Sequence, residues 1–204
     1  MNRVIRVRSR WSLPHWESAD GTYFVTFRLH DSLPSHVVDA LASLPKAVTF
    51  PLGSLQEHAE LARLRFIETH LDMGLGECWL KRPGIAEIVA GALTYFDKER
   101  YELDGWCVMP NHVHVIVKPF GDLDAVIHSW KSFTAHEANR VLGRAGAFWQ
   151  REYFDHLIRE ENDLARVRRY IAMNPTKAGL NDWKWCSAGV SPAFEGRRDG
   201  GATP

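Results

Sequence analysis

Four short runs of the chain have the hydrophobic patterning of β-strands. In the first, Thr22–Leu29, hydrophobic and polar side chains alternate with a period of two residues, which predicts a strand with one buried face. Two further runs, Trp106–Met109 and His112–Val117, flank a Pro-Asn dipeptide that favours a turn, so they predict a tight hairpin. The fourth run, Tyr153–Glu160, predicts another strand.

Hydrophobic residues three or four positions apart predict helices between these strands. Ser54 and Glu57 form an S-x-x-E capping box at the start of the first helix. Asn162 is the expected N-cap of the last helix, and the Asn174-Pro175 pair is expected to end it. The four helices are expected at about residues 55–71, 83–101, 122–143 and 163–173.

The order strand, helices, strand, strand, helix, strand, helix predicts an α+β fold. It fits a ferredoxin-like or RRM-like antiparallel sheet with helices on one face and a further helix at the C-terminal end. A chain of 204 residues is long enough for one compact domain, which we expect at residues 21–186. Residues 1–20 form a basic arm, and residues 187–204, rich in Gly, Pro, Ser and Arg, are expected to be disordered.

The charges are unevenly distributed along the chain. The formal net charge is zero, which argues against a simple basic nucleic-acid-binding protein. However, Arg3, Arg6, Arg8 and Arg10 occur with no acid among the first ten residues, whereas Glu57–Asp104 holds ten acids against six bases. An arm without acids gains little by folding on itself, so we expect its arginines to contact phosphates.

The cysteines and the hydropathy pattern constrain the type of protein. Cys78, Cys107 and Cys186 are odd in number, widely spaced and without a CxxC pair. This pattern indicates neither a disulfide framework nor a zinc knuckle, so we expect buried or half-buried thiols. Since no run approaches the roughly 18 apolar residues of a membrane helix, a cytoplasmic protein with no membrane association is expected.

Two histidines stand two residues apart on a predicted strand. His112 and His114 should therefore leave the same face, while the valines between and beyond them point to the other face. That geometry suits two ligands on one divalent metal ion. The alternative is that the pair arises by chance in a chain with ten histidines, and spacing alone does not separate the two readings.

A tyrosine and an asparagine lie one turn apart on the last predicted helix. Tyr170 and Asn174 fall at one border of an apolar stripe that also holds Val167 and Ile171. If this stripe packs on the sheet, a hydroxyl and an amide oxygen could face whatever the histidines hold. Alternatively, Tyr170 is an aromatic residue at the edge of the core and Asn174 only a helix cap before proline.

The chain contains four segments in this order: MPNHVHVIV, HSWKSFTAHEANRVLG, FWQREYFDHLIR and RRYIAMNPTKAGL. They resemble the successive signatures of HUH single-tyrosine transposases, specifically the REP-associated tyrosine transposases. The resemblance covers about residues 21–180, and it implies that His112 and His114 bind Mg²⁺ or Mn²⁺ with Asn174 as the third ligand. It also implies that Tyr170 attacks a DNA phosphate, and that the substrate is single-stranded or hairpin DNA, often repeated palindromic sequences.

The chemistry implied is strand cleavage and transfer through a 5′-phosphotyrosine. One phosphodiester replaces another, so the step is reversible and permits joining without ATP. Two imidazoles with one amide oxygen form a softer site than an all-oxygen magnesium site, so Mn²⁺ should serve at least as well. Flanking DNA is expected to contact side chains that are basic or aromatic, with a solvated or core location as the alternative for several of them: Arg168, Arg169, Lys131, Arg159, Arg8, Arg10 and Trp149.

Two other functions fit the same pattern. A ferredoxin-like sheet also serves non-catalytic domains that bind single-stranded nucleic acid, although those domains usually place aromatic residues where this strand has His112 and His114. A metal-dependent nuclease that uses activated water is the second alternative, in which Tyr170 only orients the substrate. The protein is expected to be a monomer or a homodimer.

Overall fold

The computed structural model describes residues 6–10, 13–18, 20–43 and 55–187. Five antiparallel strands form the main sheet in the order β6-β3-β5-β4-β7, and β1 pairs with β2 in a separate hairpin. The strands are β1 (Arg6–Arg10), β2 (Leu13–Glu17), β3 (Thr22–Arg28), β4 (Tyr101–Val108), β5 (His112–Pro119), β6 (Phe154–Ile158) and β7 (Cys186–Ser187). The helices are α1 (Ser35–Ser43), α2 (Leu55–Asp72), the 3-10 helix η1 (Trp79–Lys81), α3 (Pro83–Tyr95), α4 (Leu123–Leu142) and α5 (Glu161–Lys177).

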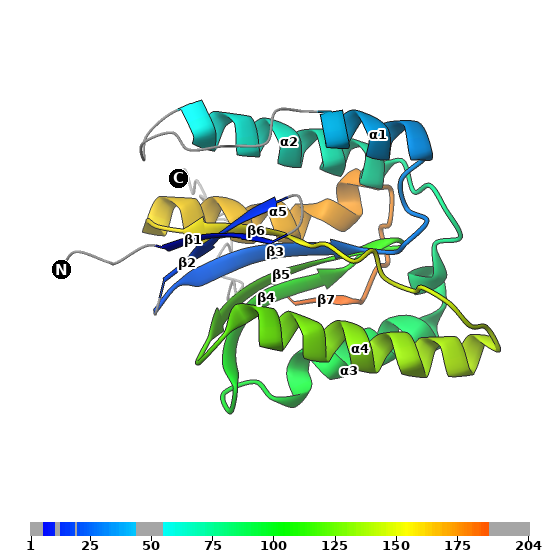
Figure 1. Ribbon diagram of the computed structural model, residues 1–204. Coiled ribbons are helices and arrows are strands. Elements are labelled where there is room, and N and C mark those ends of the chain that lie inside the picture. The colour runs from blue at the N-terminus through cyan, green and yellow to red at the C-terminus, as the bar shows by residue number, and fades with distance from the viewer. Residues whose placement is uncertain (1–5, 11–12, 19, 44–54, 188–204) are drawn as a thin grey trace, which may run out of the picture.

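Helices cover both faces of the main sheet. In Figure 1, α3 and α4 lie below the sheet, α5 lies directly above it, and α1 and α2 lie above α5. The predicted α+β class with an antiparallel sheet is confirmed, and the expected helical cover on one face corresponds to α3 and α4. None of the helices in the described ranges is both long and apolar enough to cross a membrane.

Each face of the sheet has its own hydrophobic core, because β5 alternates between them. Val113, Val115 and Val117 are fully buried against α3 and α4. Ile116 points the other way and packs with Ile171 and other apolar residues of α5. The predicted alternation of the central strand is therefore confirmed.

The predicted helices differ from the observed ones at their ends. The helix that begins at Pro83 ends at Tyr95 rather than near Tyr101, because Tyr101 already pairs with Pro119 as the first residue of β4. The last helix begins at Glu161, with Glu160 rather than Asn162 at the N-cap. It also continues through Pro175 to Lys177, because backbone hydrogen bonds from Ala178 to Asn174 and from Leu180 to Pro175 hold the turn that follows the proline. The capping residue Ser54 lies outside the described residues.

Three further features were not predicted. The basic arm does fold on itself: β1 pairs with β2 in an antiparallel hairpin whose register puts Arg6 opposite Glu17. Helix α1 occupies a stretch in which no helix was expected. Cys107 and Cys186 form a disulfide rather than remaining thiols, because the β4·β7 pairing places them opposite each other; Cys78 is a buried free cysteine. The tail beyond Ser187 lies outside the described residues.

Candidate active site

The two histidines of β5 lie at the centre of the sheet on the face covered by α5. His112 is 1% exposed and His114 is 0% exposed. Their neighbours on the flanking strand are Arg28 and Thr26 of β3, which pair with them in register. The rings are 4.6 Å apart between centroids, and the two Nε2 atoms are 3.0 Å apart. The predicted convergence of these side chains is thus present.

The hydrogen bonds of Asn111 fix the tautomer of His112. The Asn111 Nδ2 group donates to the carbonyl oxygens of Leu71 and Leu75, at 3.2 and 3.1 Å, so its Oδ1 is left to accept. That oxygen is 2.7 Å from His112 Nδ1, which must therefore carry the proton. A neutral His112 then presents the lone pair of Nε2 toward His114.

His114 has a partner that can either donate or accept. Its Nδ1 lies 2.8 Å from the hydroxyl oxygen of Thr26. When the hydroxyl donates, His114 Nε2–H can donate to His112; when the hydroxyl accepts, both Nε2 lone pairs face the same point. Thr26 therefore allows the second imidazole to become a ligand without any movement of the backbone.

Burial keeps both imidazoles neutral. It lowers the pKa of His112 to about 3, and it lowers the pKa of His114 well below the usual value, with a further decrease caused by His112. Neutral imidazole is the form that binds metal ions. Two adjacent neutral rings, each with its outer nitrogen hydrogen-bonded, have the arrangement seen around metal-ligating histidines.

Helix α5 brings Tyr170 and Asn174 to the histidine pair. The Tyr170 hydroxyl is 3.4 Å from His114 Nε2, and the Asn174 Nδ2 atom is 3.2 Å from the same nitrogen. The Tyr170 ring contacts the rings of His114 and Phe24 edge-on, at centroid distances of 5.2 and 5.9 Å. The predicted proximity of the four side chains is therefore observed, across 56 residues between His114 and Tyr170.

The packing of α5 explains why Tyr170 faces inward. Val167 and Ile171 are buried in the core between α5 and the sheet, as their spacing predicts. Arg168 forms hydrogen bonds through Nε and Nη2 to the two carboxylate oxygens of Asp104, which lies at a bulge in β4. This bidentate ion pair ties the middle of the helix to the sheet two residues before Tyr170.

Helix α2 adds an acidic side chain that the sequence analysis did not identify. Glu68 lies close enough to the Tyr170 hydroxyl for each group to shift the pKa of the other. Burial, and then Coulombic repulsion from Glu68 and Asp72, raise the pKa of Tyr170 above its usual value. Lys177 lies over the Tyr170 ring at 5.4 Å from the centroid. Lys177 follows Tyr170 and Asn174 at helical spacing, so it could have been identified from the sequence as a residue on the same face of α5. Nothing in the spacing of α2 indicates Glu68.

The side chains at this point fit a divalent metal ion. His112 and His114 supply neutral nitrogens, and the Oδ1 atom of Asn174 is buried with no hydrogen-bond partner among the described residues. Exchange of the two amide groups of Asn174 would bring that oxygen to the histidine pair. Within the described ranges, no three His, Cys, Asp or Glu side chains form a metal-binding group. Any ion held here therefore depends on the asparagine or on ligands from the substrate or solvent.

The residues expected to contact DNA occupy different environments. Lys131 donates hydrogen bonds to the carbonyl oxygens of Gln150 and Arg151, and burial lowers its pKa to about 8. Trp149 is 7% exposed and donates to Thr134, which favours the core location that the sequence left open. Arg169 and Arg159 are exposed. Arg8 and Arg10 lie on β1, but their side chains lie outside the described part of the structure.

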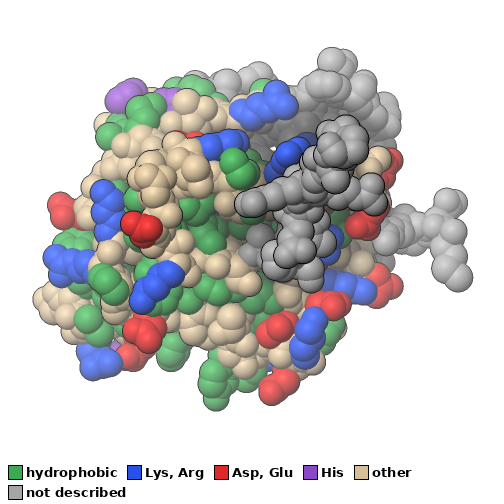
Figure 2. Space-filling view, turned by 180° about the vertical axis from the view of Figure 1, so that it is seen from behind, with side chains coloured by type: hydrophobic (Ala, Val, Ile, Leu, Met, Phe, Trp, Pro, Cys, Tyr) green, Lys and Arg blue, Asp and Glu red, His purple; other side chains and the backbone are tan. Residues whose placement is uncertain are grey.

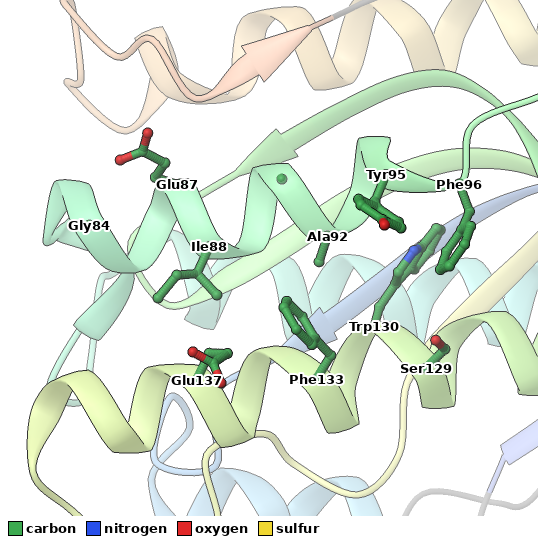
Figure 3. Close-up of a pocket in the computed structure, with 11 residues that line it drawn as sticks. Gly84, Glu87, Ile88, Ala92, Tyr95, Phe96, Ser129, Trp130, Phe133 and Glu137 are labelled. Atoms are coloured by element: carbon green, nitrogen blue, oxygen red, sulfur yellow. The ribbon is translucent and has the colours of Figure 1, made fainter.

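The opposite face of the molecule has a different character. A groove of about 710 Å³ separates α3 from α4, and Figure 3 shows Ile88, Tyr95, Trp130 and Phe133 lining it. It lies across the sheet from the histidines, and its lining residues include Glu87 and Glu137 but no histidine. On the face seen in Figure 2, acidic and basic side chains are intermixed rather than separated by sign.

Comparisons with known proteins find similarity to transposases. The family described as "Transposase IS200 like" matches residues 84–174, a segment that contains both histidines, Tyr170 and Asn174. The chain is 31% identical over 103 residues to a Haemophilus influenzae protein named as a REP-associated tyrosine transposase, and the match covers 43% of this chain and 58% of that protein. It is 31% identical over 88 residues to the REP-associated tyrosine transposase of Escherichia coli, covering 41% of this chain and 52% of that one.

The chain therefore spans little more than half the length of these curated relatives. A solved structure of a REP-associated tyrosine transposase bound to a REP hairpin aligns with a TM-score of 0.48 at 19% identity, over 88% of this chain and 80% of that chain. The sequence matches confirm the resemblance predicted from the four motifs: over less than half of its length, the chain is similar to the IS200-like and REP-associated tyrosine transposases.

Proposed function

We propose that this protein cuts and rejoins single-stranded or hairpin DNA through a covalent bond between Tyr170 and a 5′ phosphate. The observation that carries the proposal is the position of the Tyr170 hydroxyl, 3.4 Å from His114 Nε2, on the helix that also brings Asn174 to that nitrogen. A hydroxyl that only anchored the helix would not need two neutral histidines and an amide around it. The names of the curated relatives support DNA with repeated palindromic sequences as the substrate.

The chain supplies the nucleophile and positions it. The oxygen of Tyr170 would attack the phosphorus, and the bond between phosphorus and the 3′ oxygen would break, which leaves a 5′-phosphotyrosine and a free 3′ end. Attack of a 3′-hydroxyl on the phosphotyrosine reverses the sequence and joins strands. The Arg168–Asp104 ion pair and the contact with Phe24 would hold the Tyr170 ring beside the histidine pair.

A divalent ion would complete this site. His112, His114 and Asn174 are the residues that would hold it, and Mg²⁺ or Mn²⁺ would supply positive charge to stabilise the negative charge that develops on the phosphate. Thr26 and Asn111 would orient the two imidazoles from behind. The basic side chains proposed to contact the flanking phosphates are Arg169, Arg159, Arg8 and Arg10. Arg168 contacts Asp104 directly and Trp149 is buried, so a structural function is the simpler account for these two residues.

Formation of a covalent adduct tests the proposal. The purified protein is incubated with Mn²⁺ and a labelled pool of single-stranded hairpin oligonucleotides, and denaturing gel electrophoresis separates DNA-linked protein. We expect an adduct that disappears in Tyr170→Phe and in His112→Ala. Free 5′-phosphate products without an adduct, retained in Tyr170→Phe, would support a nuclease that activates water. Binding without any cleavage would support a non-catalytic nucleic-acid-binding domain.

A further inference from the structure

Arg28 lies on the same face of the sheet as the histidine pair. In β3, Phe24 packs into the core beneath α5 and Thr26 contacts His114, so the next residue of this alternation is Arg28. The register of the β3·β5 pair places Arg28 directly opposite His112. Side chains at opposite positions begin about 4.5–5.5 Å apart, so the base of the Arg28 side chain is adjacent to that of His112.

The guanidinium group of Arg28 is fixed through one of its nitrogens. Its Nη1 group donates to the carbonyl oxygen of Leu29 at 3.4 Å and to Ser32 Oγ at 3.2 Å. Ser32 is 0% exposed and donates to the same carbonyl oxygen. The backbone N–H of Leu29 donates in turn to the carbonyl oxygen of Asn111, the residue that orients His112. The guanidinium group and the histidine pair are therefore attached to one rigid segment.

The other edge of this guanidinium group carries a pair of donors that suits an oxyanion. The Nε and Nη2 groups of Arg28 have no hydrogen-bond partner among the described residues. Together they form the parallel pair that matches two oxygens of a carboxylate or a phosphate. Arg168 uses the same two groups to bind the carboxylate of Asp104. The protein thus supplies an anion for the donor pair of Arg168, while the donor pair of Arg28 can receive one from a ligand.

The charges around Arg28 also favour an anion. Burial lowers the pKa of Arg28 to about 10, and the charge of Glu152 opposes this decrease only in part. A second cation lies nearby: Lys131 Nζ donates to the carbonyl oxygen of Gln150, whose backbone N–H donates to the carbonyl oxygen of Arg28. Burial, and then the charge of Arg28, lower the pKa of Lys131. This end of the site therefore holds partly buried positive charge that a phosphate would balance.

We propose that the Nε and Nη2 groups of Arg28 hold two oxygens of a DNA phosphate beside the histidine pair, an inference that rests on the proposed function. The contact fixes the DNA strand at the site and takes no part in the breaking of bonds. Arg28 precedes the segment 84–174 that matches the transposase family. It is also absent from the basic residues that the sequence pattern indicated as DNA contacts, because nothing in the pattern of β3 shows which donors remain unused.

Binding of a labelled single-stranded hairpin tests this contact without cleavage. A hairpin selected for binding to the wild-type protein is titrated in the presence of Mn²⁺, and all proteins carry Tyr170→Phe. Fluorescence anisotropy should show that Arg28→Gln binds about tenfold or more weakly than its parent, as expected for loss of charge-assisted hydrogen bonds. Arg100→Gln, the same change at an exposed residue just before β4, should bind like its parent. Mn²⁺ affinity without DNA, measured by electron paramagnetic resonance, should be equal in all three proteins.

A methylphosphonate scan of the hairpin distinguishes a phosphate contact from a structural effect. At each phosphate in turn, a methyl group replaces one non-bridging oxygen and removes the negative charge. With the phosphate held by Arg28 modified, the affinities of Arg28→Gln and its parent should agree within about twofold, and at every other position the difference should remain. If Arg28→Gln does not fold, Arg28→Lys provides the same comparison, because lysine keeps the charge but lacks the paired donors.

The outcomes separate the two proposals. If the wild-type protein neither binds a hairpin nor forms an adduct, the proposed function fails and this inference falls with it. Binding without an adduct would refute the cleavage mechanism, and the scan would still decide the assignment of Arg28. If an adduct forms and Arg28→Gln binds as tightly as its parent, only that assignment is overturned. An equal defect with every modified hairpin, or a loss of Mn²⁺ affinity in Arg28→Gln, would likewise overturn the phosphate contact.

Discussion

The two faces of the main sheet use the same strand for different purposes. On the α3–α4 face, β5 contributes Val113, Val115 and Val117 to an apolar core. On the α5 face, it contributes His112 and His114, which are as deeply buried but are hydrogen-bonded to side chains. The comparison teaches that one face can stabilise the fold while the other keeps polar groups at fixed positions. Substitutions on the two faces should therefore have effects of different kinds.

The largest effect is expected when a histidine of the α5 face is removed. His112→Ala should weaken Mn²⁺ binding at least about 100-fold, since loss even of a group that only orients a metal ligand costs 10–100-fold. Isothermal titration with Mn²⁺ measures this change. His128→Ala, an exposed histidine of α4, is the control. Equal Mn²⁺ affinity in His112→Ala and the wild-type protein would contradict a metal site at the histidine pair.

A substitution on the other face of the same strand should change stability instead. Val115→Ala removes two buried methyl groups and should lower the free energy of unfolding by about 2–3 kcal/mol. Urea denaturation measures the change, and Val141→Ala, 54% exposed, should have little effect. Mn²⁺ affinity should stay within about twofold of the wild-type value. A large loss of metal affinity in Val115→Ala would mean that the two faces are not separable.

Much of this contrast could be predicted from the sequence, because it depends on local periodicity. The alternation along β5 assigns valines and histidines to opposite faces, and the spacing of Tyr170 and Asn174 places them on one turn of a helix. Glu68 could not be found in this way. Its position beside Tyr170 depends on how α2 packs against the site, which involves hydrogen bonds between residues 36 and 40 positions apart. The Cys107–Cys186 bond was missed for the same reason, since it follows from a pairing of distant strands.

The buried histidines should also make the metal-free protein sensitive to acid. Burial lowers the pKa of His112 from 6.5 to about 3, so between these pH values the unfolded chain holds a proton that the folded chain lacks. The free energy of unfolding should therefore fall as the pH drops through this range, by up to about 1.4 kcal/mol per pH unit for each such histidine.

Glu68 opposes this trend, because its pKa is raised from 4.5 to about 7 and the folded state is the one that holds the proton in that range. Acid sensitivity should thus be steeper in Glu68→Gln than in the wild-type protein between pH 4.5 and 6.5. Urea denaturation in the presence of a chelator measures both slopes. Equal slopes in the two proteins would contradict the burial of a protonated Glu68.

The smallest effects concern the arginines of α5. Arg168→Gln breaks the ion pair between Arg168, 27% exposed, and Asp104, 23% exposed. It should lower the free energy of unfolding by about 1 kcal/mol. Arg169→Gln should leave stability unchanged but reduce the salt dependence of hairpin binding by about one phosphate contact. Fluorescence anisotropy at several salt concentrations measures the second effect. If Arg168→Gln rather than Arg169→Gln reduces the salt dependence, Arg168 belongs to the DNA interface.

The central claim is that Tyr170 becomes covalently joined to DNA, and identification of the modified residue tests it most directly. The adduct formed with Mn²⁺ and hairpin DNA is digested with nuclease and protease and analysed by tandem mass spectrometry. We expect a nucleotide linked through its 5′ phosphate to Tyr170 in the peptide that also contains Asn174. A nucleotide on any other residue, or 5′-phosphorylated DNA released with no modified peptide, would contradict the account.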